Sequence, residues 1–169
     1  MQSGEIVNKV AQSGLVVIDL KDFYTTGERV VYDLAQNLYQ GLILKEKDFR
    51  QFLKEHAWES YTGKNVAITC SADAIVPMWA YMLLAVHLRP YANHFVFGTL
   101  EDLEKELFCK KFAQTNWQEY EGKKVVVKGC SDLLIPTYAY VELTRILQPI
   151  VQSLMFGEPC STVPIYKRK

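Results

Sequence analysis

Apolar and polar positions recur along this chain with two periods, one typical of strands and one typical of helices. Short apolar runs rich in β-branched residues predict strands at 15–20, 29–34, 65–69, 94–97, 124–128 and 153–156. Apolar residues three or four positions apart predict helices at 47–56, 77–88, 100–112 and 136–147, and a short one within 1–13. The turn-forming run Thr25-Thr26-Gly27 separates the first two strands, so we expect an N-terminal β-hairpin.

The second half of the chain repeats a long part of the first. Residues 58–98 align without a gap on residues 117–157, and 14 of the 41 positions are identical, where chance gives roughly 2 or 3. Each copy has the strand–helix–strand pattern of a βαβ unit. Because the helix at 77–88 is apolar almost all round, we expect both copies to share one core.

The predicted architecture is a single α/β domain over residues 1–169. It contains an internally duplicated βαβ unit with pseudo-twofold symmetry, preceded by the N-terminal β-hairpin. Pro159 and Pro164 lack a backbone N–H, which confines the end of the chain to a sheet edge or a surface groove. The parts are a hairpin and helix at 1–57, the repeats at 58–98 and 117–157, and a tail at 158–169.

Each copy carries a polar loop between its first strand and its helix. The loops are Cys70-Ser-Ala-Asp73 and Gly129-Cys-Ser-Asp132. Ligands of open α/β sheets bind at the carboxyl ends of the strands, where the next helix presents unpaired N–H groups. A tyrosine follows each helix-opening proline by four residues, about one turn from the loop. The candidate ligand-binding residues are therefore Ser71, Asp73, Ser131, Asp132, Tyr81 and Tyr140.

The cysteines leave several chemical roles open. A thiolate near a helix N-terminus has a lowered pKa, which makes it a better nucleophile and a better metal ligand. Cys70, Cys130 and Cys160 are thus candidate ligands for a metal ion or an iron–sulfur species. No Cys-x-x-Cys spacing supports that role, and a buried thiol without a function is the alternative. Asp73 and Asp132 also have a structural alternative, because an Asp just before a helix caps it.

Other side chains have mainly structural interpretations. Among the histidines, we expect His87 in the core, and His56 and His94 on the surface. The acidic residues near the hairpin, which include Asp19 and Asp33, predict a solvated face. Paired aromatic residues at the start of each copy are expected to anchor the link onto the core: Trp58, Tyr61, Trp117 and Tyr120.

Composition narrows the classes of function. Nineteen basic residues balance nineteen acidic ones, so no net charge favours nucleic acid or a membrane surface as a partner. The first residues show no basic leader or long apolar run, and no segment is long enough to span a bilayer. Four cysteines without paired spacing are typical of a reducing compartment. We expect a cytoplasmic location.

Several strings of the sequence carry a resemblance to a known family. They are EIVNKVAQSGLVVIDLKDFY, YQGLILKEKDFR, TCSADAIVPMWAYML and FGEPCSTVPIYK. Over residues 4–167 the chain resembles a bacterial family classed only as a domain of unknown function, which implies no activity. The resemblance also implies genes placed beside iron–sulfur cluster assembly machinery. Iron–sulfur assembly proteins are then implied as partners, and a thiol or metal role is favoured for Cys70, Cys130 and Cys160.

Three classes of function remain open from the sequence. The leading hypothesis is a small accessory protein that binds a metal, an iron–sulfur species or a small anionic ligand at the paired loops, without being a self-sufficient enzyme. A homo-oligomeric interaction or scaffold module, most simply a homodimer, is the first alternative, favoured by the apolar helices. A thiol-dependent enzyme is the second, and it requires one cysteine to be much more reactive than the others.

Overall fold

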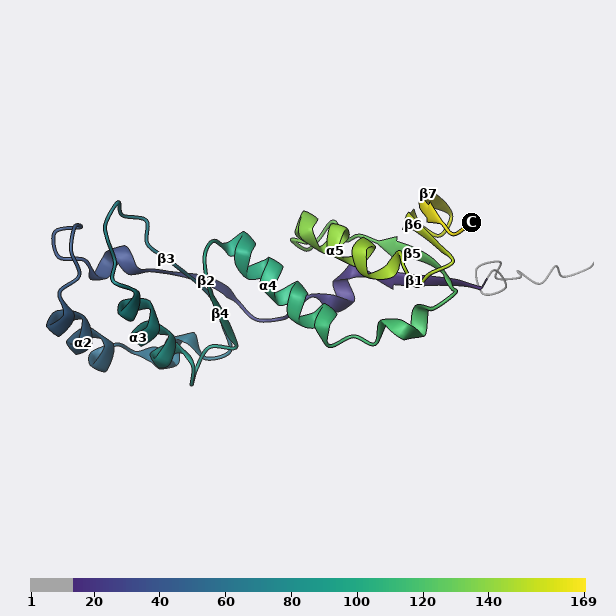
Figure 1. The fold of residues 1–169 in the computed structure, drawn as a ribbon. Coiled ribbons are helices and arrows are strands. Elements are labelled where there is room, and N and C mark those ends of the chain that lie inside the picture. Colours follow the sequence, from purple (N-terminus) through teal and green to yellow (C-terminus); the bar gives the residue numbers. More distant parts are fainter. Residues whose placement is uncertain (1–13) are drawn as a thin grey trace, which may run out of the picture. The chain divides into compact units, whose positions relative to one another are not determined.

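The computed structural model describes residues 14–169, and the helix expected within 1–13 lies outside them. The chain divides into two compact units (Figure 1). Unit 1 consists of the described residues up to Tyr24 together with Phe108–Lys169, and unit 2 is Thr25–Leu107. The chain therefore starts unit 1, builds unit 2 as an insertion, and returns through helix α4 (Leu100–Ala113) to complete unit 1.

Unit 1 contains a four-stranded sheet. Its strands are β1 (Leu15–Asp19), β5 (Lys124–Lys128), β6 (Ser153–Glu158) and β7 (Ser161–Lys167), in the order β1-β5-β6-β7. The first three are parallel, and helix α5 (Thr137–Leu147) connects β5 to β6. Strand β7 returns antiparallel to β6 after a tight turn, and Pro164 lies beside a register shift in that pairing. The tail is thus an edge strand, as its prolines predicted.

Unit 2 contains a three-stranded parallel sheet. Its strands are β2 (Arg29–Asp33), β3 (Asn65–Thr69) and β4 (His94–Phe97), in the order β2-β3-β4. Helix α2 (Glu46–Glu55) lies between β2 and β3 in the chain, and α3 (Met78–Leu88) connects β3 to β4. The α/β class is confirmed, and the helices and strands that were predicted within residues 14–169 lie within a few residues of their predicted positions.

The predicted N-terminal hairpin is wrong. β1 pairs in parallel with β5, and β2 pairs in parallel with β3. A short 3₁₀ helix directly follows each of these strands: η1 (Leu20–Phe23) follows β1, and η2 (Leu34–Asn37) follows β2. The Asp that precedes each 3₁₀ helix accepts a hydrogen bond from the backbone N–H two residues later, at 3.0 Å in both cases. This local bond turns the chain out of the strand, so β1 is not followed by a tight reversal.

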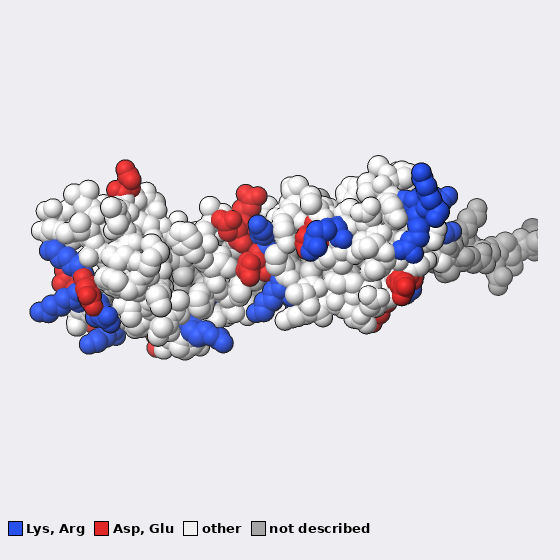
Figure 2. All heavy atoms as spheres, viewed as in Figure 1, with Lys and Arg blue, Asp and Glu red and all other residues white. Residues whose placement is uncertain are grey.

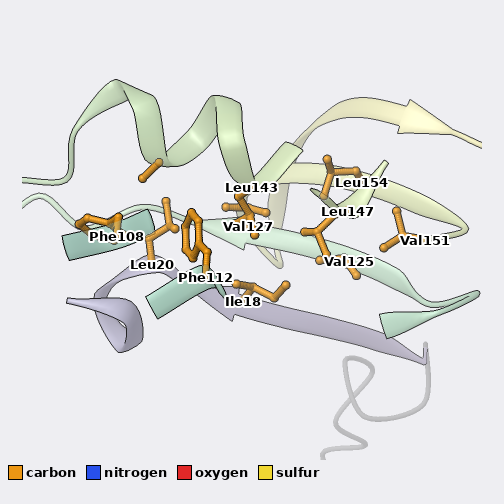
Figure 3. Packing of buried hydrophobic residues seen from close by; sticks show 11 residues of the cluster. Ile18, Leu20, Phe108, Phe112, Val125, Val127, Leu143, Leu147, Val151 and Leu154 are labelled. Atoms are coloured by element: carbon orange, nitrogen blue, oxygen red, sulfur yellow. The ribbon is translucent and has the colours of Figure 1, made fainter. Parts of the chain in front are cut away.

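The buried clusters each lie within one unit. In unit 1, side chains of β1, β5, β6, α5 and the end of α4 pack together on one face of the sheet (Figure 3). In unit 2, Val66 and Ile68 of β3 pack against α2 and α3, whereas Ala67 packs with Leu103 and Leu107 of α4. The central strand β3 is therefore covered on both faces, which explains its continuous apolar run. The expectation that both repeats share one core stays a prediction.

Two further 3₁₀ helices precede the central strands, η3 (Trp58–Tyr61) and η4 (Trp117–Tyr120). Trp58 Nε1 donates a hydrogen bond to the carbonyl of Leu53 at 2.7 Å, and Trp117 Nε1 donates one to the carbonyl of Phe112 at 2.8 Å. Both indoles contribute to the packing of their own unit. The prediction that these aromatic residues are packing anchors agrees with this geometry. Within residues 14–169, no helix combines the length and apolar character needed to cross a membrane.

Candidate functional site

The two polar loops do follow the central strands, but their aspartates do not cap the next helix. Helix α3 begins at Met78 and α5 at Thr137, and the residues that precede them are Pro77 and Pro136, with no side-chain cap in either case. Asp73 and Asp132 lie four residues before these prolines, and both are exposed. The capping interpretation is therefore wrong, because each loop continues in an irregular conformation before its helix starts.

In unit 2, the loop is held by an aspartate that the sequence analysis assigned to a solvated face. The carboxylate of Asp33, at the end of β2, accepts hydrogen bonds from the hydroxyl and from the backbone N–H of Ser71. It also accepts one from the N–H of Ala35. The Ser71 hydroxyl, followed by these backbone N–H groups, lowers the pKa of Asp33. Ser71 therefore makes a structural contact with the end of β2.

In unit 1, the corresponding edge carries opposite charges. Lys128 at the end of β5 forms an ion pair with Glu158 at the end of β6, with 2.9 Å between Nζ and Oε1. Asp19 at the end of β1 is the register partner of Lys128. The hydrogen bond that Lys128 donates to Glu158, and then the negative charge of Glu158, raise the pKa of Lys128, and Asp19 and Cys130 add to this. Lys128 therefore stays cationic at neutral pH.

A polar hollow of about 300 Å³ opens at this edge. We define it by its lining residues: Lys128, Gly129, Cys130, Tyr140, Phe156, Gly157 and Glu158. Beside it lies an apolar hollow of about 220 Å³, which shares Tyr140 and Phe156 with it. The other lining residues of the apolar hollow are Val127, Thr144, Leu154, Met155 and Ile165. The Tyr140 and Phe156 rings meet edge to face, with centroids 5.8 Å apart, and form the boundary between the two hollows.

The predicted tyrosines do lie beside their loops. A Cβ built on Gly129 would be 2.7 Å from the hydroxyl oxygen of Tyr140, so the ring lies directly over the start of the loop. Burial raises the pKa of Tyr140, and Cys130 raises it further. In unit 2, burial and then Cys70 raise the pKa of Tyr81, whose ring meets Phe97 edge to face at 5.3 Å. Each tyrosine therefore remains a neutral hydroxyl near its thiol.

The structure brings together some of the predicted site residues. Cys130 and Tyr140 line the polar hollow, and the Ser131 hydroxyl donates a hydrogen bond to Asp132 in the adjoining loop. Cys160 is exposed at the turn between β6 and β7 and is not part of the lining. Cys70, Ser71, Asp73 and Tyr81 belong to unit 2. Each loop is described within its own unit, so the predicted convergence of the two loops stays a prediction.

The described residues offer no preformed metal site. All four cysteines are free thiols, and Cys70, Cys109 and Cys130 are half-buried. Among residues 14–169, no three side chains of His, Cys, Asp or Glu lie close enough together to hold a metal ion.

Cys109, for which the sequence analysis made no functional prediction, has a specific partner in unit 1. Its Sγ lies 2.8 Å from the hydroxyl oxygen of Tyr138. This hydrogen bond, together with burial, raises the pKa of Tyr138 to about 12. Both residues line a third hollow, of about 350 Å³, whose rim carries the Glu142–Arg145 ion pair.

The histidines only partly follow their predicted positions. His87 is half-buried, and its Nδ1 lies 2.8 Å from the carbonyl oxygen of Leu83. His56, which we expected on the surface, lies in an aromatic cluster, with ring centroids 4.6 Å from Trp58 and 4.9 Å from Phe52. Its Nε2 is buried without a hydrogen-bond partner among the described residues. Burial accordingly lowers the pKa of His56.

This burial predicts a loss of stability in mild acid. Because the folded protein lowers the pKa of His56 below its usual 6.5, the unfolded chain binds the proton more readily. The free energy of unfolding should therefore fall as the pH drops from 7 to 5. His56→Phe keeps the ring contacts and removes the titration, so its urea-denaturation midpoint should change less over this interval. An unchanged pH dependence in the variant would assign the effect to other groups.

Sequence reasoning did not identify four residues near these strand ends as candidate site residues: Lys128, Phe156, Glu158 and Asp33. A second, short repeat in the sequence could have drawn attention to Asp19 and Asp33. The string Val16-Val-Ile-Asp-Leu20 matches Val30-Val-Tyr-Asp-Leu34 at four of five positions. It marks β1 and β2 as equivalent edge strands, each ending in an aspartate next to the central strand. Lys128 and Glu158 have no counterpart in the other repeat, so no repeat signal pointed to them.

Comparison of the sequence with models of protein families identifies the family of this chain. The model for the family described as "Protein of unknown function (DUF2480)" matches residues 4–168. The chain belongs to this family. Neither a search of curated proteins nor a search of solved structures found a match.

Proposed function

We propose that the protein binds a small organic anion in unit 1, with the charged group of the ligand in the polar hollow and its apolar part in the apolar hollow. The observation that carries this proposal is the pair of adjoining hollows, which share Tyr140 and Phe156 at the carboxyl ends of two parallel strands. Ligands of α/β proteins gather at this edge of the sheet. The combined lining has a cation, its carboxylate partner and a hydroxyl on one side, and mainly apolar side chains on the other.

The anionic character of the ligand is supported by the charges at the hollow. Lys128 stays protonated and supplies a cation. The first turn of α5 contributes Tyr140 to the lining, and no side chain caps this end of the helix. A helix N-terminus favours negative charge because its N–H groups are unsatisfied. The Lys128–Glu158 ion pair is solvent-exposed, so it contributes little to the stability of the fold. A bound anion can therefore replace Glu158 as the partner of Lys128.

Benzoate is the simplest probe of this proposal, because it joins a carboxylate to one apolar ring. By calorimetric titration at pH 7, benzoate should bind more tightly than neutral benzyl alcohol, and benzylammonium should bind least. Lys128→Gln should weaken benzoate binding about tenfold or more, because a hydrogen bond to a charged group contributes roughly 1.5–3 kcal/mol. Glu158→Gln should strengthen binding, by up to about fivefold, because it releases Lys128 and removes a like charge.

Lys124→Gln is the matched control, because Lys124 is the exposed residue at the other end of the same strand. It should leave the affinity for benzoate unchanged. Tightest binding of benzylammonium, or equal effects of Lys124→Gln and Lys128→Gln, would contradict the proposal.

We also propose that the two units arose by duplication of one ancestral unit. Equivalent residues make equivalent contacts inside each unit. Gly63 N–H donates to the carbonyl of Tyr91 at 3.1 Å, and Gly122 N–H donates to that of Ile150 at 2.9 Å. The two tryptophan hydrogen bonds and the two tyrosine–phenylalanine ring pairs support the same proposal. The pseudo-twofold relation, the cytoplasmic location, and the metal and iron–sulfur roles with assembly partners stay predictions.

A further inference from the structure

Strand β4 is the last strand of the unit 2 sheet, and its outer edge carries no partner strand among the described residues. The sheet order ends at β4, and no strand within residues 14–169 pairs with its outer side. In unit 1 the corresponding strand β6 does have a neighbour there, because β7 pairs with it over its whole length. Within unit 2, the N–H of Gly98 donates to the carbonyl of Ile68 on β3. Since backbone groups alternate along a strand, the N–H groups of Phe95 and Phe97 point to the open side.

This edge lacks the features that normally prevent strand pairing. Exposed edges are usually protected by prolines, lysines or bulges. The edge strand β7 has such protection, with Pro164 at an irregularity in the pairing and Lys167 at its end. Strand β4 reads His94-Phe-Val-Phe97 and contains no proline, no lysine and no carboxylate. Phe97 is 70% exposed although it is a large apolar side chain.

An apolar face of helix α3 adjoins this edge. Met78, Met82 and Val86 are spaced by four residues and are 66–71% exposed, and Ile75 in the preceding loop is 93% exposed. Tyr81 links this face to Phe97 through its ring contact. Helix α3 contains no Asp, Glu, Lys or Arg, and the surface over it in Figure 2 shows few charged groups.

We infer that β4 and the exposed face of α3 form a homodimer interface, with β4 of two copies pairing antiparallel across a twofold axis. The backbone groups along the outer side of β4 can form hydrogen bonds with another strand. The patch is apolar and lacks charged side chains, so a second copy of the same patch is complementary to it, as an isologous contact requires. Five exposed side chains at about 100 Å² each supply roughly 500 Å² of apolar surface per copy. A standard interface buries about 800 Å² per partner, and the paired strand backbones add to the apolar contribution.

The test is the oligomeric state of the full-length protein and three variants, measured by sedimentation equilibrium. The wild-type chain should be a dimer at micromolar concentration. Met82→Lys places like charges at the centre of the interface and should raise the dimer dissociation constant at least about a hundredfold. Phe97→Pro removes an outward N–H while leaving the Gly98 bond to β3, and should also give monomers with an unchanged circular dichroism spectrum.

Val141→Lys is the matched control, because Val141 occupies the equivalent position on α5, is 66% exposed, and should not affect the dimer. A wild-type chain that stays monomeric up to hundreds of micromolar would overturn the inference, and would assign this surface to another occupant. A dimer that Val141→Lys disrupts as strongly as Met82→Lys would overturn it as well.

Discussion

Glu104→Ala should lower the free energy of unfolding by about 3–5 kcal/mol, the largest effect that we expect from a single polar substitution in this chain. Glu104 lies on α4 and is 3% exposed. Its carboxylate forms a two-pronged contact with Arg29 on β2, in which Nη2 lies 3.1 Å from Oε2 and Nε hydrogen-bonds to Oε1. The Arg29 side chain is itself only 14% exposed, so removal of the carboxylate leaves a guanidinium charge in a poorly solvated position.

Urea denaturation followed by tryptophan fluorescence measures this effect. The control is Glu106→Ala, two residues away on the exposed face of the same helix, which should change stability by less than about 0.5 kcal/mol. The double variant Arg29→Met with Glu104→Leu should recover most of the loss, because apolar residues can replace a buried ion pair without leaving a charge behind. If the double variant is as unstable as Glu104→Ala, the effect comes from altered packing and not from the loss of the Glu104 carboxylate beside Arg29.

Asn65→Leu should cost about 2–4 kcal/mol of stability. Asn65 is fully buried at the start of β3. Its Nδ2 donates to the carbonyl of Thr26 at 3.0 Å, and its Oδ1 accepts a hydrogen bond from Asn93 Nδ2 at 2.7 Å. Leu has a similar size but leaves both partners without their hydrogen bonds, and each buried unsatisfied group costs roughly 1–3 kcal/mol.

The repeat supplies a matched control for this substitution. Lys124 occupies the equivalent position at the start of β5 and is exposed. Lys124→Leu should therefore leave the urea midpoint nearly unchanged. A loss of stability as large as that of Asn65→Leu would show that the effect comes from the strand position itself. An unchanged midpoint in Asn65→Leu would show that Thr26 and Asn93 find other partners.

Local features of this fold were predictable from the sequence, because they depend on neighbouring residues. The predicted helix at 77–88 is observed as Met78–Leu88. At the start of α4, Thr99 and Asp102 are only three residues apart, and the side chain of each accepts a hydrogen bond from the backbone N–H of the other. The partners of β1 and β2 depend instead on residues more than thirty positions away in the chain. An apolar run shows that a strand is buried but not which strand lies beside it. The predicted pairing of β1 with β2, its nearest neighbour in the chain, is therefore wrong.

In the candidate site, too, contacts between residues close in the sequence were predictable, whereas contacts between distant residues were not. Tyr140 was placed near its loop because one helical turn fixes the distance between them. Lys128 and Glu158 come together only because β5 and β6 are parallel neighbours whose carboxyl ends lie at one edge. Asp33 reaches Ser71 across the β2–β3 pairing, 38 residues apart in the chain. The charged residues at the strand ends therefore meet only because of the order of the strands in the sheet. The sequence pattern does not contain that order.

The most direct test of the proposed ligand site is the amide spectrum of the isotopically labelled, full-length protein during a titration with benzoate. The account predicts saturable chemical-shift changes that centre on Lys128, Cys130 and Gly157, with the Phe156 ring protons shifted as well. It also predicts that these changes are lost in Lys128→Gln and kept in Lys124→Gln. Shifts that centre on the unit 2 loop around Ser71, or no saturable shifts at all, would contradict the account.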